Sequence, residues 1–243
     1  MQILRLIKRK LERPGGISAI MANIPVKIEE AFSPRYRRLH KSGRDFDARY
    51  GTDTNTPVPA AMLDIDDEAA KFAGRYYPTP VGLIREMLGG LGISFQGYTF
   101  VDFGSGKGRA LLLAAEFPFK KIIGVEFSPT LNSIANKNIE LYVKKTGPVC
   151  KDIQSICQDA CAFPIPSGPC VFYYFNPFAP EIMSAVLANI VASLTKDARD
   201  IKLVFLKPLF NDLVEASGRF TCIKTGKNAD YPYPYRMYAP NKQ

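Results

Sequence analysis

The sequence of 243 residues contains no tryptophan, only one histidine (His40) and no long apolar run. Its five cysteines include no pair at CxxC spacing. We therefore expect no metal site and no cysteine–histidine nucleophile, and we interpret the thiols as reduced. The apolar runs are far shorter than the roughly 20 residues that cross a bilayer. No membrane span is expected, and a cytoplasmic location is predicted.

Positive charge is concentrated at one end of the chain. Residues 1–50 contain 12 Lys or Arg and 5 Asp or Glu, a net charge of +7, whereas the rest of the chain carries only +2. Basic residues also interrupt residues 1–13, which argues against a signal peptide. We predict that residues 1–74 form a basic N-terminal extension. It could attract nucleic acid, anionic lipid or an acidic protein, or pack on the domain through a helix at 3–11.

The remainder, residues 75–243, alternates short apolar runs with segments at helical spacing. This pattern predicts an α/β fold: a Rossmann-like, doubly wound sheet, mostly parallel, with helices on both faces. Two final strand candidates with no helix between them predict an antiparallel hairpin at one edge. The predicted strands are 98–103, 120–127, 153–160, 170–175, 201–206, 219–225 and 235–240, and the main helices are 108–117, 129–145, 180–194 and 209–216.

Upstream of the first strand the pattern is weaker. Residues 17–60 are mixed and polar, with turn residues near their end. A short helix is expected at 61–72. A second helix is expected over about 80–88, capped by Thr79 or a neighbour, with Pro80 in its first turn.

Glycines occupy every second position between the first predicted strand and its helix. The residues of this turn are Asp102, Gly104, Ser105, Gly106 and Gly108. Glycine lets a backbone turn tightly and approach a ligand, and the N–H groups at a helix start favour a carboxylate. A dinucleotide fingerprint would need glycine in place of Arg109, and a P-loop would need glycine in place of Val101. The sequence therefore matches neither of these two nucleotide-binding motifs.

Together with Glu126 after the next strand, this turn resembles motif I of the class I S-adenosylmethionine (SAM)-dependent methyltransferases. The resemblance covers about residues 75–240 and implies that SAM is the cofactor. It implies that Asp102 and the glycine turn bind the methionine end and that Glu126 accepts bonds from the ribose hydroxyls. It also implies that Asp159, after the third strand, binds the adenine amino group; a plain turn cap is the alternative.

The segment after the fourth predicted strand concerns the methyl acceptor. Asn176, Pro177 and Phe178 resemble the Asn-Pro-Pro-aromatic loop of amino-directed methyltransferases, except that Phe178 replaces the second proline. They are also similar to the Asn-x-Phe loop of Dot1-like lysine methyltransferases. The resemblance implies that Asn176 and Phe178 orient an amine beside the reactive methyl, Asn176 also contacting the cofactor. It further implies that Tyr77 and Thr79 contact SAM or the substrate channel; simple packing of Tyr76, Tyr77 and Phe178 is the alternative.

Several functions stay open at this level. A methyltransferase with a protein lysine as acceptor is ranked ahead of one acting on a nucleic-acid base. A protein substrate is therefore the first expected partner, and nucleic acid bound by the basic segment is the second. A SAM-binding protein without catalysis is a further alternative. Asp102 and Arg109 argue against an NAD-dependent oxidoreductase.

Overall fold

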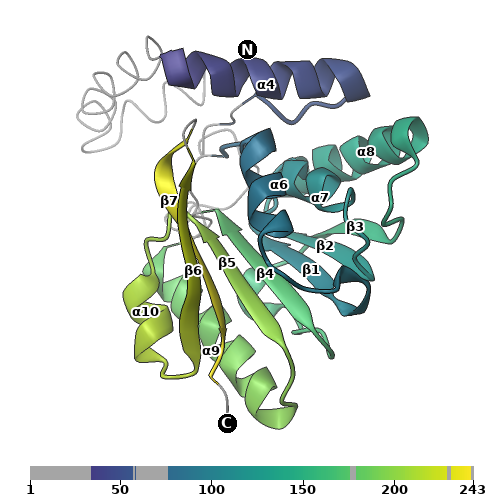
Figure 1. The fold of residues 1–243 in the computed structure, drawn as a ribbon. Helices are drawn as coiled ribbons and strands as arrows, with labels where there is room; N and C mark the ends of the chain where they lie inside the picture. The colour runs from purple at the N-terminus through teal and green to yellow at the C-terminus, as the bar shows by residue number, and fades with distance from the viewer. Residues whose placement is uncertain (1–33, 57, 59–75, 176–178, 229–230, 242–243) are drawn as a thin grey trace, which may run out of the picture.

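The structure is a computed structural model that describes residues 34–56, 58, 76–175, 179–228 and 231–241 (Figure 1). The helices expected at 3–11 and 61–72 lie outside the described residues, as do Asn176 and Phe178. Among the described residues, no helix is long and apolar enough to cross a bilayer.

A seven-stranded sheet forms the centre of the molecule, in the order β3-β2-β1-β4-β5-β7-β6. Strands β1 to β5 run parallel to one another, whereas β7 is antiparallel to both β5 and β6. The strands are β1 (Thr99–Phe103), β2 (Lys121–Glu126), β3 (Ile153–Cys157), β4 (Cys170–Phe175), β5 (Ile201–Leu206), β6 (Phe220–Asn228) and β7 (Tyr231–Pro240). The predicted Rossmann-like fold with an antiparallel hairpin at one edge is confirmed.

Helices cover both faces of this sheet (Figure 1). On one face, α6 (Val81–Gly89), α7 (Arg109–Ala114) and α8 (Pro129–Thr146) contribute to one hydrophobic core. On the other, α9 (Pro180–Lys196) and α10 (Asn211–Ala216) contribute to a second core. All five residues of β1 are buried, as expected for a central strand of a parallel sheet that is covered on both sides.

One helix was not predicted. Helix α4 (Pro34–Tyr50) occupies a segment that the sequence analysis describes as polar. Leu39, Phe46 and Tyr50 form its narrow apolar stripe, and Phe46 and Tyr142 stack with ring centroids 6.1 Å apart. Figure 1 shows α4 at the top of the view, and it packs against α6 and α8. The described part of the N-terminal extension thus joins the same core as α6, while a boundary between residues 74 and 75 stays a prediction.

The predicted cap of α6 is wrong. Pro80 is the N-cap residue and no side chain bonds the first turn. Thr79 is buried, and its Oγ1 lies 3.1 Å from the Tyr173 hydroxyl on β4. The hydroxyl forms this tertiary hydrogen bond instead of a local one, because the extended backbone at Pro80 carries Thr79 away from the helix start.

Candidate functional site

The glycine turn between β1 and α7 is held tightly against β2. Gly104 and Ser105 donate their N–H groups to the Val125 carbonyl at 2.8 and 3.2 Å. The Ser105 side chain fits against Gly124, where an added Cβ would lie only 2.6 Å from Ser105 Oγ. The position of the turn therefore depends on Gly124 in the neighbouring strand β2.

The three glycines of the turn have different surroundings. All three have positive φ, at 77° for Gly104, 55° for Gly106 and 84° for Gly108. Gly104 is exposed, whereas Gly108 is the N-cap of α7, and a Cβ on it would lie 3.2 Å from that of Ala135. Gly106 is covered by the Tyr76 ring, into which an added Cβ would project. Of the three, Gly104 offers a ligand the most accessible backbone.

Asp102 and Glu126 lie near the ends of neighbouring parallel strands, beside this turn. Asp102 is only 4% exposed, and its side-chain carboxylate accepts no hydrogen bond from any described residue. Burial raises its pKa well above the usual range, and the charge of Glu126 adds to the shift. A buried carboxylate without donors favours a cationic partner, which would replace its lost hydration.

Glu126, by contrast, already has backbone partners. Its Oε2 accepts the Gly106 N–H and its Oε1 accepts the Ser128 N–H, both at 2.8 Å. Burial raises the pKa of Glu126, and these hydrogen bonds oppose the shift. Because a carboxylate offers about four acceptor positions, Glu126 can hold the turn and still accept two hydroxyl groups.

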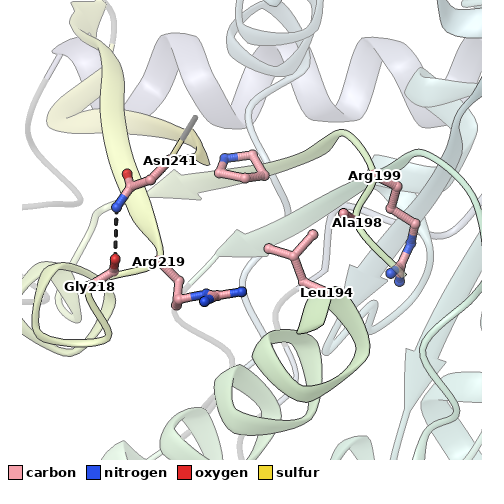
Figure 2. A pocket seen from close by; sticks show the side chains of 7 residues that line it. Leu194, Ala198, Arg199, Gly218, Arg219 and Asn241 are labelled. Carbon is pink, nitrogen blue, oxygen red and sulfur yellow. Dashed lines mark hydrogen bonds between the residues drawn. The ribbon is translucent and has the colours of Figure 1, made fainter. Parts of the chain in front are cut away.

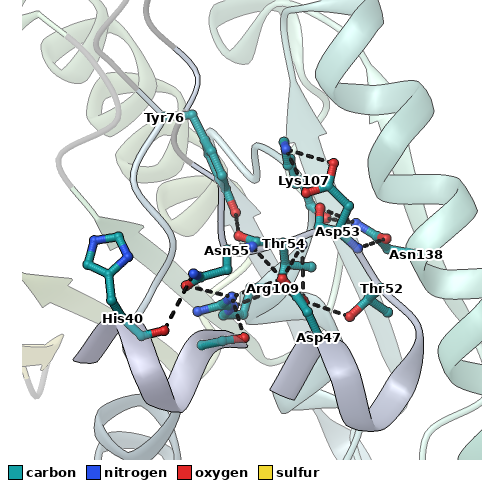
Figure 3. Close-up of polar contacts among 11 residues, drawn as sticks. His40, Asp47, Thr52, Asp53, Thr54, Asn55, Tyr76, Lys107, Arg109 and Asn138 are labelled. Carbon is teal, nitrogen blue, oxygen red and sulfur yellow. Dashed lines mark hydrogen bonds and ion pairs between the residues drawn. The ribbon is translucent and has the colours of Figure 1, made fainter. Parts of the chain in front are cut away.

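A second group of polar residues surrounds the turn and was not predicted from the sequence (Figure 3). Asp47, in α4, accepts the side-chain hydroxyl of Thr52, the N–H and hydroxyl of Thr54, and the N–H of Asn55, at 2.6 to 3.1 Å. These bonds fold residues 52–55 into a compact structure, called here the 52–55 turn.

Two cations join the glycine turn to the 52–55 turn. The buried Lys107 ammonium contacts both Asp53 carboxylate oxygens at 2.9 and 3.0 Å. Arg109 Nε donates to Thr54 Oγ1 at 2.8 Å. Asn138 of α8 binds the backbone N–H and C=O of Asp53 and the carbonyl of Lys107. The sequence contains one indication of these contacts. Residues 47–55 are rich in acids and hydroxyl groups, and Lys107 and Arg109 in and after the glycine turn are cations that could bind them.

Tyr76 completes this arrangement. Its hydroxyl donates to the Thr54 carbonyl at 2.7 Å, while its ring lies against Gly106. Burial raises the pKa of Tyr76, so the hydroxyl stays a neutral donor throughout the physiological range. The predicted contact residue Tyr77 is exposed, and its role stays a prediction.

Asp159 lies beyond the end of β3, which stops at Cys157. It is exposed, and its Oδ1 accepts the Cys161 N–H at 2.9 Å, capping the 3-10 helix η3 (Ala160–Ala162). The capping alternative is thus present, and binding of adenine by Asp159 stays a prediction. No cluster of three His, Cys, Asp or Glu within the described ranges could hold a metal ion.

A cavity of about 250 Å³ lies elsewhere, beside the amino end of β5 (Figure 2). Arg199 lines it, but its guanidinium already donates to the carbonyls of Pro166, Gly168, Ser193 and Asp197 and to the Ser193 hydroxyl. The other lining residues are Leu194, Ala198, Gly218, Arg219, Pro240 and Asn241. None of these belongs to the glycine-turn site.

No protein-family model and no curated protein matches this chain. Several solved methyltransferases are similar to it in structure. The ribosomal protein L11 methylase from Lactobacillus delbrueckii subsp. bulgaricus is 16% identical, with a TM-score of 0.46 over 67% of this chain and 77% of that one. An RNA methyltransferase from Salinibacter ruber, solved with S-adenosyl-L-homocysteine, is 18% identical, with a TM-score of 0.46 over 68% and 95%.

A third similar structure is magnesium protoporphyrin IX methyltransferase from Synechocystis PCC 6803 with bound SAM. It is 15% identical, with a TM-score of 0.46 over 66% of this chain and 77% of that one. At these identities the similarity concerns the fold, and it determines neither an activity nor an acceptor for this chain.

Proposed function

We propose that this protein is a SAM-dependent methyltransferase that acts on an amine acceptor. The observation that supports this most directly is the buried carboxylate of Asp102, which lacks a donor and lies beside Glu126 and the exposed Gly104. SAM has an ammonium group on its methionine part and a pair of hydroxyls on its ribose, and these groups match the two acids. Asp102 would bind the amino group and Glu126 the ribose, with Asp159 at the adenine.

SAM, when bound, supplies a methyl group on a sulfonium that is already a good leaving group. The protein then has to orient the acceptor in line with the methyl and exclude water. An amine must also lose its proton before it can act as a nucleophile. In this proposal Asn176 and Phe178, which follow β4, orient that amine, and Thr79 lies beside the same channel.

A protein lysine is the favoured acceptor because of the similarity of residues 176–178 to the loops described above. A nucleic-acid base is the second candidate, supported by the charge of α4. The basic residues of α4 that are exposed are Arg37, Arg38, Lys41, Arg44 and Arg49. Such a charge distribution favours polyanions, although Asp45 lies 4.0 Å from Lys41 and offsets part of it.

Calorimetric titration with S-adenosylhomocysteine and with NAD tests the cofactor. We expect binding of the first only, and we expect Glu126→Ala to weaken it by at least about 100-fold, since hydrogen bonds to a charged acceptor contribute about 1.5–3 kcal/mol each and Glu126 would accept two. Glu140→Ala, which removes an exposed carboxylate from α8, is the matched control and should bind normally. Unchanged affinity in Glu126→Ala would refute the ribose assignment.

Methyl transfer is tested with radiolabelled SAM and a cell lysate, followed by separate protease and nuclease digestion of the labelled fraction. We expect protease-sensitive label on lysine, whereas nuclease-sensitive label would support the second acceptor. In Asn176→Ala we expect transfer to be lost while S-adenosylhomocysteine still binds. A wild-type protein that binds the cofactor and labels nothing would instead be a SAM-binding protein without catalysis.

A further inference from the structure

The Tyr76 side chain covers Gly106, the middle glycine of the turn. Its position is linked to Arg109, which follows Gly106 by three residues. The Tyr76 ring lies on Gly106, and Arg109 contacts the same threonine to which Tyr76 is hydrogen-bonded. We propose that Arg109 and Thr54 fix the Tyr76 ring as a wall of the cofactor site, which makes Arg109 and Tyr76 positioning residues for cofactor binding. This inference rests on the proposed function.

The first contact in this chain is that of Arg109 with Thr54. Both side chains are buried, and Arg109 Nε donates to Thr54 Oγ1 at 2.8 Å. Thr54 Oγ1 in turn donates to Asp47 Oδ1 at 2.6 Å, and Asp47 Oδ2 lies 3.7 Å from Arg109 Nη2. The threonine is thus held from both sides by opposite charges, in a region where water cannot compete.

The second contact is that of Thr54 with Tyr76. The Thr54 carbonyl accepts the Tyr76 hydroxyl at 2.7 Å. Because Arg109 binds the Thr54 side chain, it also helps to position the ring through this carbonyl. The Tyr76 backbone is also held, because its N–H donates to the Val58 carbonyl at 3.1 Å. The aromatic ring is therefore restrained at both of its ends.

The third contact is that of the ring with Gly106, and it connects the chain to the proposed ribose acceptor. Gly106 carries the Tyr76 ring against its Cα, and its N–H donates to Glu126 Oε2 at 2.8 Å. A shift of the ring would let Gly106 move, and Glu126 would lose one of its backbone hydrogen-bond donors. The Tyr76 ring and the Glu126 carboxylate contact the same residue, Gly106. The position of the ring can therefore affect the carboxylate through Gly106.

The absence of tryptophan from the chain permits a direct optical test. Tyr76→Trp introduces a single tryptophan over Gly106, and Phe95→Trp introduces one in the 3-10 helix η2 (Phe95–Gly97), before β1. On titration with S-adenosylhomocysteine we expect the emission of Tyr76→Trp to change with the affinity that calorimetry gives for the same variant. The emission of Phe95→Trp should stay constant. An unresponsive Tyr76→Trp variant that nevertheless binds the ligand would overturn the proposal.

The positioning role is tested with two conservative variants. Tyr76→Phe removes only the bond to Thr54, and Arg109→Lys keeps the positive charge but loses the Nε donor. We expect each to raise the dissociation constant for S-adenosylhomocysteine and the KM for SAM about fivefold, the size of one net hydrogen bond, with kcat unchanged. The control is Tyr98→Phe, whose hydroxyl bonds Asp200 at the other end of β1 and whose loss should leave KM unchanged.

Failure of this inference and failure of the proposed function are distinguishable. If wild-type protein binds no S-adenosylhomocysteine, the proposed function is wrong and the inference falls with it. If wild-type protein binds it and both variants have a lower Tm but an unchanged dissociation constant and KM, Arg109 and Tyr76 serve the fold only. That second result refutes the positioning role and leaves the proposed function intact.

Discussion

Two arginines are buried at opposite ends of the sheet, and their partners differ in kind. The side chains of Arg109 and Arg199 are 3% and 5% exposed. Arg199 donates mainly to backbone carbonyls, beside the cavity near the amino end of β5. Arg109 reaches mainly side chains, those of Thr54, Asn55 and Asp47, beside the glycine turn, and it also donates to the Gly43 carbonyl.

The partners also differ in their distance along the chain. Those of Arg199 lie at most 33 residues away, whereas Thr54 and Gly43 precede Arg109 by 55 and 66 residues. Any residue supplies a backbone carbonyl, so Arg199 connects loops with little demand on their sequence. Arg109 requires a hydroxyl, an amide and a carboxylate at defined positions. We infer that the Arg199 region serves stability, while the Arg109 region also serves the candidate site.

Of the two ends, the glycine-turn end should have the larger effect on cofactor binding. Gly106→Ala should weaken S-adenosylhomocysteine binding tenfold or more, because a left-handed alanine costs about 1–2 kcal/mol and its methyl would displace the Tyr76 ring. Calorimetry provides the measurement. Gly147→Ala is the matched control: Gly147 has a similar φ, 57°, and open space around its Cα. That control should lose stability alone, and equal binding by the two variants would contradict the assignment.

At the other end, the expected effect is confined to stability. Arg199→Ala removes the guanidinium donors of the Pro166 and Gly168 carbonyls and leaves them, among the described residues, only the weak Cys170 thiol, and we expect the free energy of unfolding to fall by about 3 kcal/mol. Chemical denaturation measures this change. Cofactor affinity of the folded variant should equal that of wild type. A weakened affinity would show that the two ends are coupled and would remove the distinction drawn here.

A further effect at the glycine-turn end concerns the pH dependence of stability. Because burial raises the pKa of Asp102 in the folded state, the native protein retains a proton that the unfolded chain releases above about pH 3.9. The free energy of unfolding should therefore fall as pH rises towards the folded-state pKa, by about 1.4 kcal/mol for each pH unit in that interval. Asp102→Asn should lack this decline, so its stability relative to wild type should increase with pH. Parallel pH profiles for the two proteins would refute the raised pKa.

The predicted strands and helices were recognisable because each has a pattern that burial imposes locally. Strand β4 is a continuous apolar run, and β1 is apolar except for Thr99 and Asp102, as a sheet covered on both faces requires. The acids at the ends of β1 and β2 could be predicted for a related reason: parallel strands bring the ends of successive apolar runs to one edge.

Other features depended on tertiary contacts and could not be predicted. Helix α4 has a stripe of few apolar residues among many charges, so its burial becomes evident only once Tyr142 is placed against it. Thr79 looked like a helix cap because its residue type and position fit one, but the Tyr173 hydroxyl competes for the same side chain. The contacts of Lys107 and Arg109 join segments more than 50 residues apart, over which local patterns carry no information.

The strand order also affects how the chain can mature during synthesis. Within the described sheet, β6 pairs only with β7, although β7 emerges later from the ribosome. Until β7 is translated, β5 has an unpaired edge and β6 has no strand to pair with. We therefore expect that a ribosome stalled before Tyr231 would display a nascent polypeptide with two unsatisfied strands, which chaperones would have to shield.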